Sequence, residues 1–190
     1  MDATTKKHVM DIAIHESGHA VACWALGHRV KRIEMRMIGD AVLGMTYPRF
    51  QPGAKRTDIV SIYFAGVQAV NQFSHWRLHV SLSIYDAPRP TPARLNRSIQ
   101  RFKFDEIATT SGSDFSGDLG MIEHILRGMS AVKREHVFSR ASDKCRRLLD
   151  THEHTVRRLA QELLNWGRVE GENLQLFRRE VVSGTLAGIR

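Results

Sequence analysis

Residues 9–27 read VMDIAIHESGHAVACWALG, and this stretch decides how the rest of the chain is interpreted. Apolar residues recur at helical spacing from Val9 to Leu26, and Gly27 follows as a stop signal. The spacing therefore predicts one helix with a broad apolar surface. Ser17 and Gly18 are small, so a second element can approach this helix closely.

The same helix carries the pattern His15-Glu16-Ser17-Gly18-His19. Residues four apart on a helix lie one turn above each other, so both imidazoles can bind one metal ion. Glu16 is then placed to act as general base toward a metal-bound water. The alternative is a chance pair of exposed histidines. The apolar surroundings argue against it, because burying two imidazoles and a carboxylate is costly unless a cation coordinates them.

A third ligand is needed, because catalytic zinc sites use three protein ligands and one water. Ala22 and Ala25 occupy the positions where an extended motif would carry its glycine and third histidine. Asp118 opens a later predicted helix, whose N-terminus favours the ionised carboxylate that a metal requires. The alternative is that Asp118 only stabilises the start of that helix. Asp114 and Glu123 are the reserve candidates.

The remaining pattern predicts a mainly α (α+β) fold, in which a helical bundle carries the histidine helix beside a small two- to three-stranded sheet. We expect one domain over residues 1–190, with 74–110 as an irregular insert or surface loop. The predicted strands are 30–37 and 41–47, and the predicted helices are 57–73, 119–132, 135–150, 151–166 and 172–182.

Composition restricts the function classes. The 190 residues carry a formal net charge of +8, but their basic residues form no dense run, so nucleic-acid binding is not expected as the main role. Cys23 and Cys145 lie far apart and outside any Cys-x-x-Cys pair, which predicts buried, reduced thiols. The sequence shows no signal-peptide pattern, and its longest apolar stretch, 59–70, is too short to cross a bilayer. We therefore expect a soluble, cytoplasmic protein without a membrane segment.

Several segments resemble one family. His15-Glu16-Ser17-Gly18-His19-Ala20-Val21 resembles the H-E-x-G-H-A motif of the FtsH-type zinc peptidases. Residues 111–119 are similar to the family segment whose aspartate is the third ligand, so the resemblance implies that Asp118 binds Zn²⁺. The similarity covers most of the chain and includes the strand pair at 29–33 and 43–46, the small-residue helix at 64–66 and the C-terminal helices within 148–172.

The resemblance implies a zinc-dependent endopeptidase that acts on unfolded or extended protein substrates. Family members usually carry an AAA ATPase module and a membrane anchor, whereas this sequence has no P-loop. We therefore expect either a separate ATPase partner or substrates that are already unfolded. A homo-oligomer is a further expectation, although Val67, Val70 and Asn71 stand where the family continues its helix with arginine and acids.

Three secondary expectations complete the sequence-based interpretation. Leu43, Gly44, Met45 and Thr46 could bind an extended substrate along a strand edge, with an ordinary sheet strand as the alternative. The competing functions are a catalytically silent FtsH-like interaction module and a basic nucleic-acid-binding protein. The histidines at 75, 79, 124, 136, 152 and 154 show no ligand spacing supported by context, and we expect them to lie on the surface.

Overall fold

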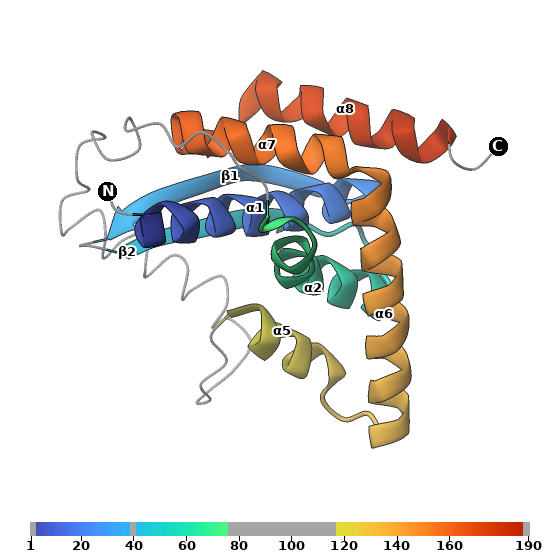
Figure 1. Ribbon diagram of the computed structural model, residues 1–190. Coiled ribbons are helices and arrows are strands. Elements are labelled where there is room, and N and C mark those ends of the chain that lie inside the picture. Colours follow the sequence, from blue (N-terminus) through green and yellow to red (C-terminus); the bar gives the residue numbers. More distant parts are fainter. Residues whose placement is uncertain (1–2, 39–40, 76–116, 188–190) are drawn as a thin grey trace.

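The computed structural model describes residues 3–38, 41–75 and 117–187. Its elements in chain order are α1 (Ala3–Ala25), β1 (Arg29–Ile38), β2 (Ala41–Arg49), α2 (Arg56–Phe73), α5 (Gly117–Leu126), α6 (Ala131–Thr151), α7 (Glu153–Trp166), β3 (Arg168–Val169) and α8 (Gly171–Ala187). The protein is thus mainly helical with a small three-stranded sheet, which confirms the predicted fold class (Figure 1). The predicted insert at 74–110 lies outside the described residues except for Ser74 and His75.

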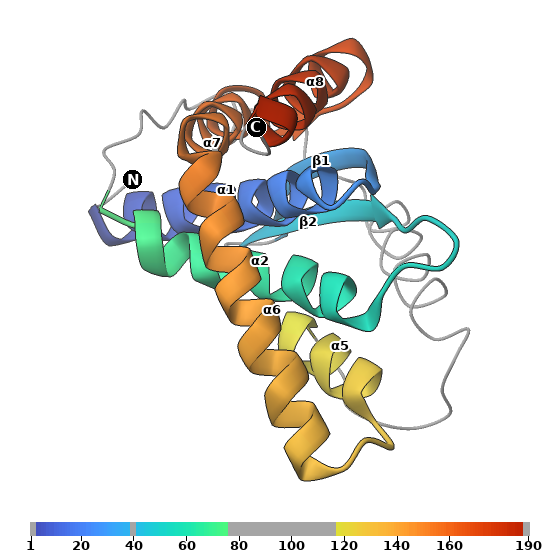
Figure 2. The same cartoon turned by 90° about the vertical axis from the view of Figure 1, so that its right-hand side faces the viewer.

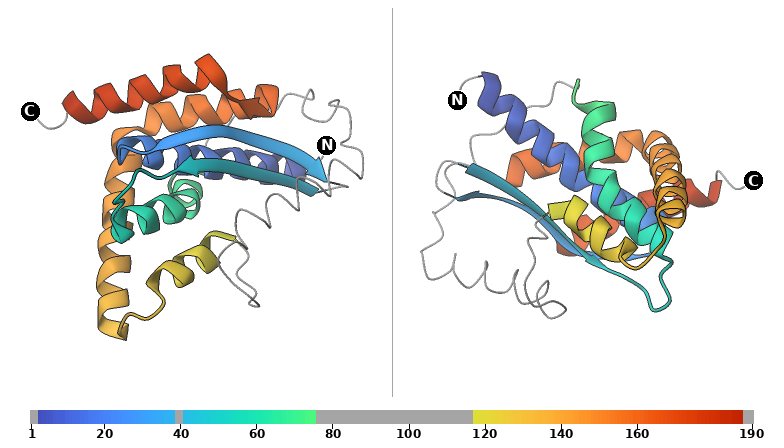
Figure 3. Two further views of the ribbon diagram at one scale, coloured as in Figure 1. Left: turned by 180° about the vertical axis from the view of Figure 1, so that it is seen from behind. Right: turned by 90° about the horizontal axis from the view of Figure 1, so that it is seen from below.

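Helix α1 is the centre of the molecule. It contacts the sheet, α2, α6, α7 and α8, so other elements cover most of its circumference (Figures 1 and 3). This position follows from its sequence, because Val9, Ala13, Ile14 and the run from Ala20 to Trp24 are all buried. Fully burying one such side chain as Ile14 stabilises the fold by roughly 1.5–3 kcal/mol.

Helices α1 and α2 approach each other closely at Gly18. A Cβ atom at this position would lie 2.5 Å from the carbonyl oxygen of Ala65 and 2.6 Å from the Cβ of Ala69, both on α2. The prediction that the small pair at 17 and 18 admits a second element is therefore confirmed. The contact brings α2 directly beside the histidines of α1.

The sheet has the order β2-β1-β3 and is antiparallel throughout. Thr46 pairs with Ile33 and Gly44 pairs with Met35, and both residues of β2 face α1. Alternation along the strand directs Leu43 to the opposite face, where it is half exposed. Every second residue of β2, including Gly44 and Thr46, therefore faces α1, the helix that carries the histidines.

Helix α5 is shorter than predicted. The sequence predicts one helix over 119–132, but α5 ends at Leu126, and the chain turns at residues 127–130 before α6 begins. Gly128 has a φ of 79° in this turn, and the Ser130 side chain caps α6 by accepting from the N–H of Lys133. Figures 1 and 2 show that α5 and α6 meet at this turn and that both lie against α2.

Three further expectations are decided by burial and helix length. Cys23 and Cys145 are free and buried, as predicted, and burial raises the pKa of each thiol to about 12. The surface prediction is wrong for His152, which is only 5% exposed because α8 packs over it. Across residues 3–38, 41–75 and 117–187, no helix combines the length and apolar character needed to cross a membrane.

Candidate metal centre

Three potential ligand atoms from two distant segments meet at one point. Oδ2 of Asp118, in the first turn of α5, lies 2.8 Å from Nε2 of His15 and 3.0 Å from Nε2 of His19. The two Nε2 atoms lie 3.0 Å from each other across one turn of α1. Among the residues that the structure describes, these three form a group that could hold a metal ion.

The size of this triangle fits a small tetrahedral cation. Zinc binds imidazole nitrogen and carboxylate oxygen at about 2.0–2.2 Å, so two tetrahedral ligands lie about 3.3 Å apart. The observed edges of 2.8–3.0 Å are about 0.3–0.5 Å shorter than that value, so the three ligand atoms need to move apart only slightly to hold the ion. Two imidazoles and one carboxylate also leave a fourth position for water, which is the ligand set of a catalytic zinc site rather than a structural one.

A backbone carbonyl of α2 orients His19. Nδ1 of His19 lies 2.7 Å from the carbonyl oxygen of Ile62, and only a protonated Nδ1 can donate to this acceptor. The neutral ring then carries its free lone pair on Nε2, the atom that faces Asp118. Metal-binding histidines usually have such a partner on their second nitrogen, because it fixes the tautomer and the ring orientation.

Gly66 of α2 leaves room for both imidazoles. A Cβ atom at this position would lie 2.5 Å from Nε2 of His15 and 2.5 Å from Nε2 of His19. Real Cβ atoms do not approach other atoms so closely, so any side chain at residue 66 would displace the rings. The backbone of α2 thus forms a wall directly beside the candidate ligand atoms.

The charges in the cluster reinforce one another. Burial disfavours the ionised carboxylate of Asp118, but hydrogen bonds from His15 and His19 outweigh it and hold the pKa of Asp118 far below its usual range. Burial also disfavours the imidazolium form of His19, yet Asp118 and Glu16 together raise the pKa of His19 to about 9. The carboxylates of Asp118 and Glu16 therefore favour a positive charge at the point where the two imidazoles meet.

Glu16 lies beside the cluster and is itself buried. Burial raises its pKa above the usual value, against the opposing influence of both histidines and of Thr46. The Thr46 hydroxyl lies 2.7 Å from Oε2 of Glu16 and 3.0 Å from its main-chain carbonyl oxygen. A carboxyl group with a raised pKa is suited to take up and release a proton near neutral pH.

The structure brings His15, Glu16, His19 and Asp118 together, which are the four residues predicted as metal ligands and base. Of the reserve ligands, Glu123 is exposed one turn beyond the cluster, and Asp114 lies outside the described residues. Sequence reasoning missed the roles of Ile62 and Gly66. The small pair Ala65-Gly66 in the apolar helix was the available signal for Gly66. The contribution of Ile62 is a backbone carbonyl, which leaves no signal in the sequence.

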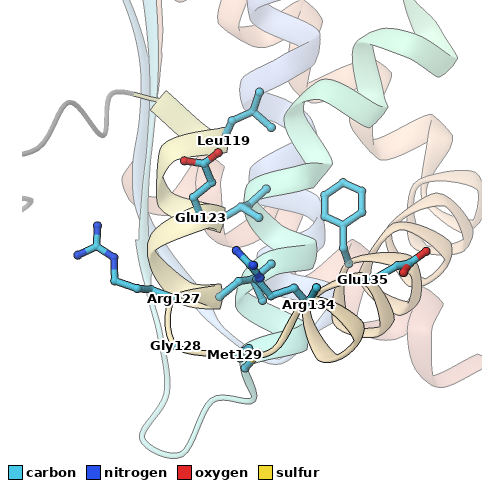
Figure 4. Close-up of a pocket in the computed structure, with 11 residues that line it drawn as sticks. Leu119, Glu123, Arg127, Gly128, Met129, Arg134 and Glu135 are labelled. Carbon is cyan, nitrogen blue, oxygen red and sulfur yellow. The ribbon is translucent and has the colours of Figure 1, made fainter.

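A cavity of about 870 Å³ opens between α5 and the start of α6. Its lining extends along α5 from Leu119, the residue after Asp118, past Glu123 and Arg127 to Arg134 and Glu135 of α6 (Figure 4). Ile122, Leu126 and Phe138 also line it. Its surface is mostly apolar, and Leu119 is 61% exposed. The cavity therefore lies next to the candidate ligands along α5 but does not contain them.

Comparison with known proteins adds no assignment, since neither the family models nor the curated proteins match this chain.

Proposed function

We propose that this protein is a zinc-dependent endopeptidase that hydrolyses peptide bonds in unfolded or extended protein substrates. The observation that carries the proposal is the convergence of His15, His19 and Asp118 on one point beside a buried glutamate. The resemblance of residues 15–21 and 111–119 to FtsH-type peptidases supports it independently. A bound zinc ion would supply a coordinated water with a pKa near 7 and would polarise a peptide carbonyl.

The chain's own residues have distinct roles in this reaction. His15, His19 and Asp118 would hold the cation through Nε2, Nε2 and Oδ2. Glu16 accepts a proton from the attacking water as the new C–O bond forms, and it returns that proton to the amide nitrogen as the C–N bond breaks. The His15 side chain remains 27% exposed and that of Asp118 23%, so water and substrate can reach the site.

The surroundings favour substrates without stable structure. Leu119 and Phe138 expose apolar surface in the cavity beside Asp118, and folded proteins bury the large apolar side chains that would fit there. A segment bound in this way must already be unfolded or be unfolded by a separate ATPase. The free, buried cysteines agree with the cytoplasmic location that the sequence predicts.

The test is cleavage of casein, an unfolded protein, by zinc-loaded protein without ATP. Wild type and Glu16→Gln are compared, and bound zinc is measured in both by atomic absorption. We expect equal zinc contents and a loss of cleavage of at least about 100-fold in the variant. Equal cleavage by both proteins would rule out Glu16 as the base. A zinc-loaded wild type that never cleaves casein would contradict a self-sufficient peptidase.

A further inference from the structure

We propose that strand β2 is the positioning element for the general base, with Thr46 holding one oxygen of Glu16 and Gly44 leaving room for the other. The proposal rests on the proposed peptidase function and assigns Thr46 a role in orienting Glu16, separate from any contact with substrate.

The first observation is the pair of short contacts made by one hydroxyl group. Thr46 Oγ1 lies 2.7 Å from Oε2 of Glu16 and 3.0 Å from the carbonyl oxygen of the same residue. Both potential acceptors of the Thr46 proton thus belong to Glu16. The hydroxyl of Thr46 on β2 thus holds the Glu16 carboxylate in a fixed position relative to the backbone of α1.

The sheet keeps this hydroxyl in place. Thr46 pairs with Ile33 of the central strand β1, and Ile33 pairs on its other side with Val169 of β3. Ile33 is fully buried, so the register of β1 is fixed by the core. Thr46 is also β-branched, which restricts rotation about χ1. The pairing of Thr46 with the buried strand β1 therefore holds the Thr46 hydroxyl in position.

The second observation concerns the other carboxylate oxygen. Among the residues that the structure describes, Thr46 donates to Oε2, and no donor lies within hydrogen-bonding distance of Oε1. Oε1 instead faces Gly44, where a Cβ atom would lie 2.6 Å from it and 2.5 Å from Cγ of Glu16. Any side chain at residue 44 would push the carboxylate out of this position.

The two observations assign different roles to the two carboxylate oxygens of Glu16. Oε2 already accepts from Thr46, and so Oε1 is the oxygen left to take a proton from the attacking water. A base that is already held in the reactive orientation does not add the free energy of its reorientation to the activation barrier. Thr46 acts through Glu16 and neither gains nor loses a proton in the cycle, so it is a positioning residue.

The test compares Thr46→Val, Thr46→Ser and the control Thr151→Val in casein-derived peptide hydrolysis. Valine keeps the shape of threonine and removes the hydroxyl. Thr151 is an exposed residue of α6 whose hydroxyl donates to the carbonyl oxygen of Arg147, so it controls for the loss of a threonine hydroxyl away from the site. We expect Thr46→Val to lower kcat about 10- to 100-fold with KM within about twofold, since a hydrogen bond to a charged group is lost. Serine should restore kcat to within about threefold of wild type.

Two readouts do not depend on activity. Zinc affinity, measured by competition with a chromogenic chelator, should stay within about twofold of wild type in Thr46→Val, because none of the three ligands is changed. Crystal structures of the variants should show the Glu16 carboxylate displaced in Thr46→Val and retained in Thr46→Ser. Gly44→Ala should displace the same carboxylate and lower kcat although Thr46 is intact.

The outcomes separate this inference from the proposed function. An inactive wild type contradicts the peptidase proposal itself. An active wild type together with a Thr46→Val variant of unchanged kcat overturns the positioning role, as would a serine variant no faster than the valine variant. Should valine prevent folding, Thr46→Ala replaces it, and an alanine variant equal to serine in kcat overturns the inference.

Discussion

His19 donates through Nδ1 to the carbonyl oxygen of Ile62 at 2.7 Å, so α2 orients a side chain that α1 supplies. One turn further along α2, Gly66 leaves the space that the rings of His15 and His19 occupy. Helix α2 therefore shapes the candidate metal centre without contributing a ligand. This relationship places part of the site in a helix that a search for ligand residues would pass over.

Gly66→Ala should lower zinc affinity at least about tenfold while the fold persists. The new Cβ would lie 2.5 Å from both Nε2 atoms, so the rings must move apart or rotate. Alanine is favoured over glycine in a helix by about 1 kcal/mol, so the helix itself gains stability. Chelator competition measures the affinity, and Asn71→Ala, at an exposed position of α2, is the control. Unchanged affinity would show that the space at residue 66 is not part of the site.

Asp118→Ala should remove stoichiometric zinc, whereas Glu123→Ala should retain it. Asp118 is the carboxylate within 3.0 Å of both imidazoles, and Glu123 is exposed on the same helix. A catalytic site with two protein ligands in place of three holds zinc weakly. The zinc-to-protein ratio after dialysis, measured by atomic absorption, decides the assignment. Zinc lost from the Glu123 variant and kept by the Asp118 variant would reverse it.

Ile122→Ala should weaken zinc binding although Ile122 is not itself a candidate ligand. Ile122 and Leu126 are buried against Val60 of α2 and Ala141 of α6, and this small cluster holds α5 in place. Removing a buried isoleucine costs about 2–5 kcal/mol. Because α5 carries Asp118, a loosened α5 presents the carboxylate less often. Val132→Ala, at a 77% exposed position of α6, is the control for both zinc affinity and urea unfolding. Equal zinc affinity in the two variants would contradict the coupling.

His152 should make the fold less stable in mild acid. Nε2 of His152 lies 3.0 Å from the Thr185 hydroxyl, which itself donates to the carbonyl of Val181, so the neutral histidine is the donor. Burial lowers the pKa of His152 below 6.5, against the opposing charge of Glu180. In acid the unfolded chain then binds more protons than the folded one. The stabilisation is complete above about pH 6.5 and is lost as the pH falls below it.

Urea unfolding at pH 7.5 and pH 5.5 measures this effect. His152→Gln should lose less stability between the two conditions than wild type does. His136→Gln, which changes an exposed histidine of α6, should behave as wild type. If His152→Gln and wild type lose the same amount, His152 takes up its proton without cost to the fold.

Sequence patterns predicted what depends on periodicity and missed what depends on tertiary contact. The helical spacing from Val9 to Leu26 predicted α1, and the His15–His19 interval predicted that two imidazoles share a face. The turn at 127–130 was missed, since apolar residues keep helical spacing through it and Gly128 alone interrupts them. Strand β3 has two residues, too few to show alternation.

In the candidate site, too, the features that depend on tertiary contacts could not be predicted from periodicity. The start of a predicted helix made Asp118 a candidate, but only the family resemblance favoured it over Asp114 and Glu123, because no spacing rule joins residues a hundred positions apart. The contact between Thr46 and Glu16 depends on the register of β2 against α1, which a sequence does not reveal. His152 is buried only because α8 folds back over it, so its own neighbours in sequence gave no indication.

The distance along the chain between the candidate ligands has a consequence for biosynthesis. His15 and Asp118 are 103 residues apart, and a ribosome adds about 5–20 residues per second. For at least about five seconds, a nascent chain therefore carries the two histidines and the glutamate without their carboxylate partner. The candidate metal centre therefore gains its third ligand only after Asp118 of α5 has been made.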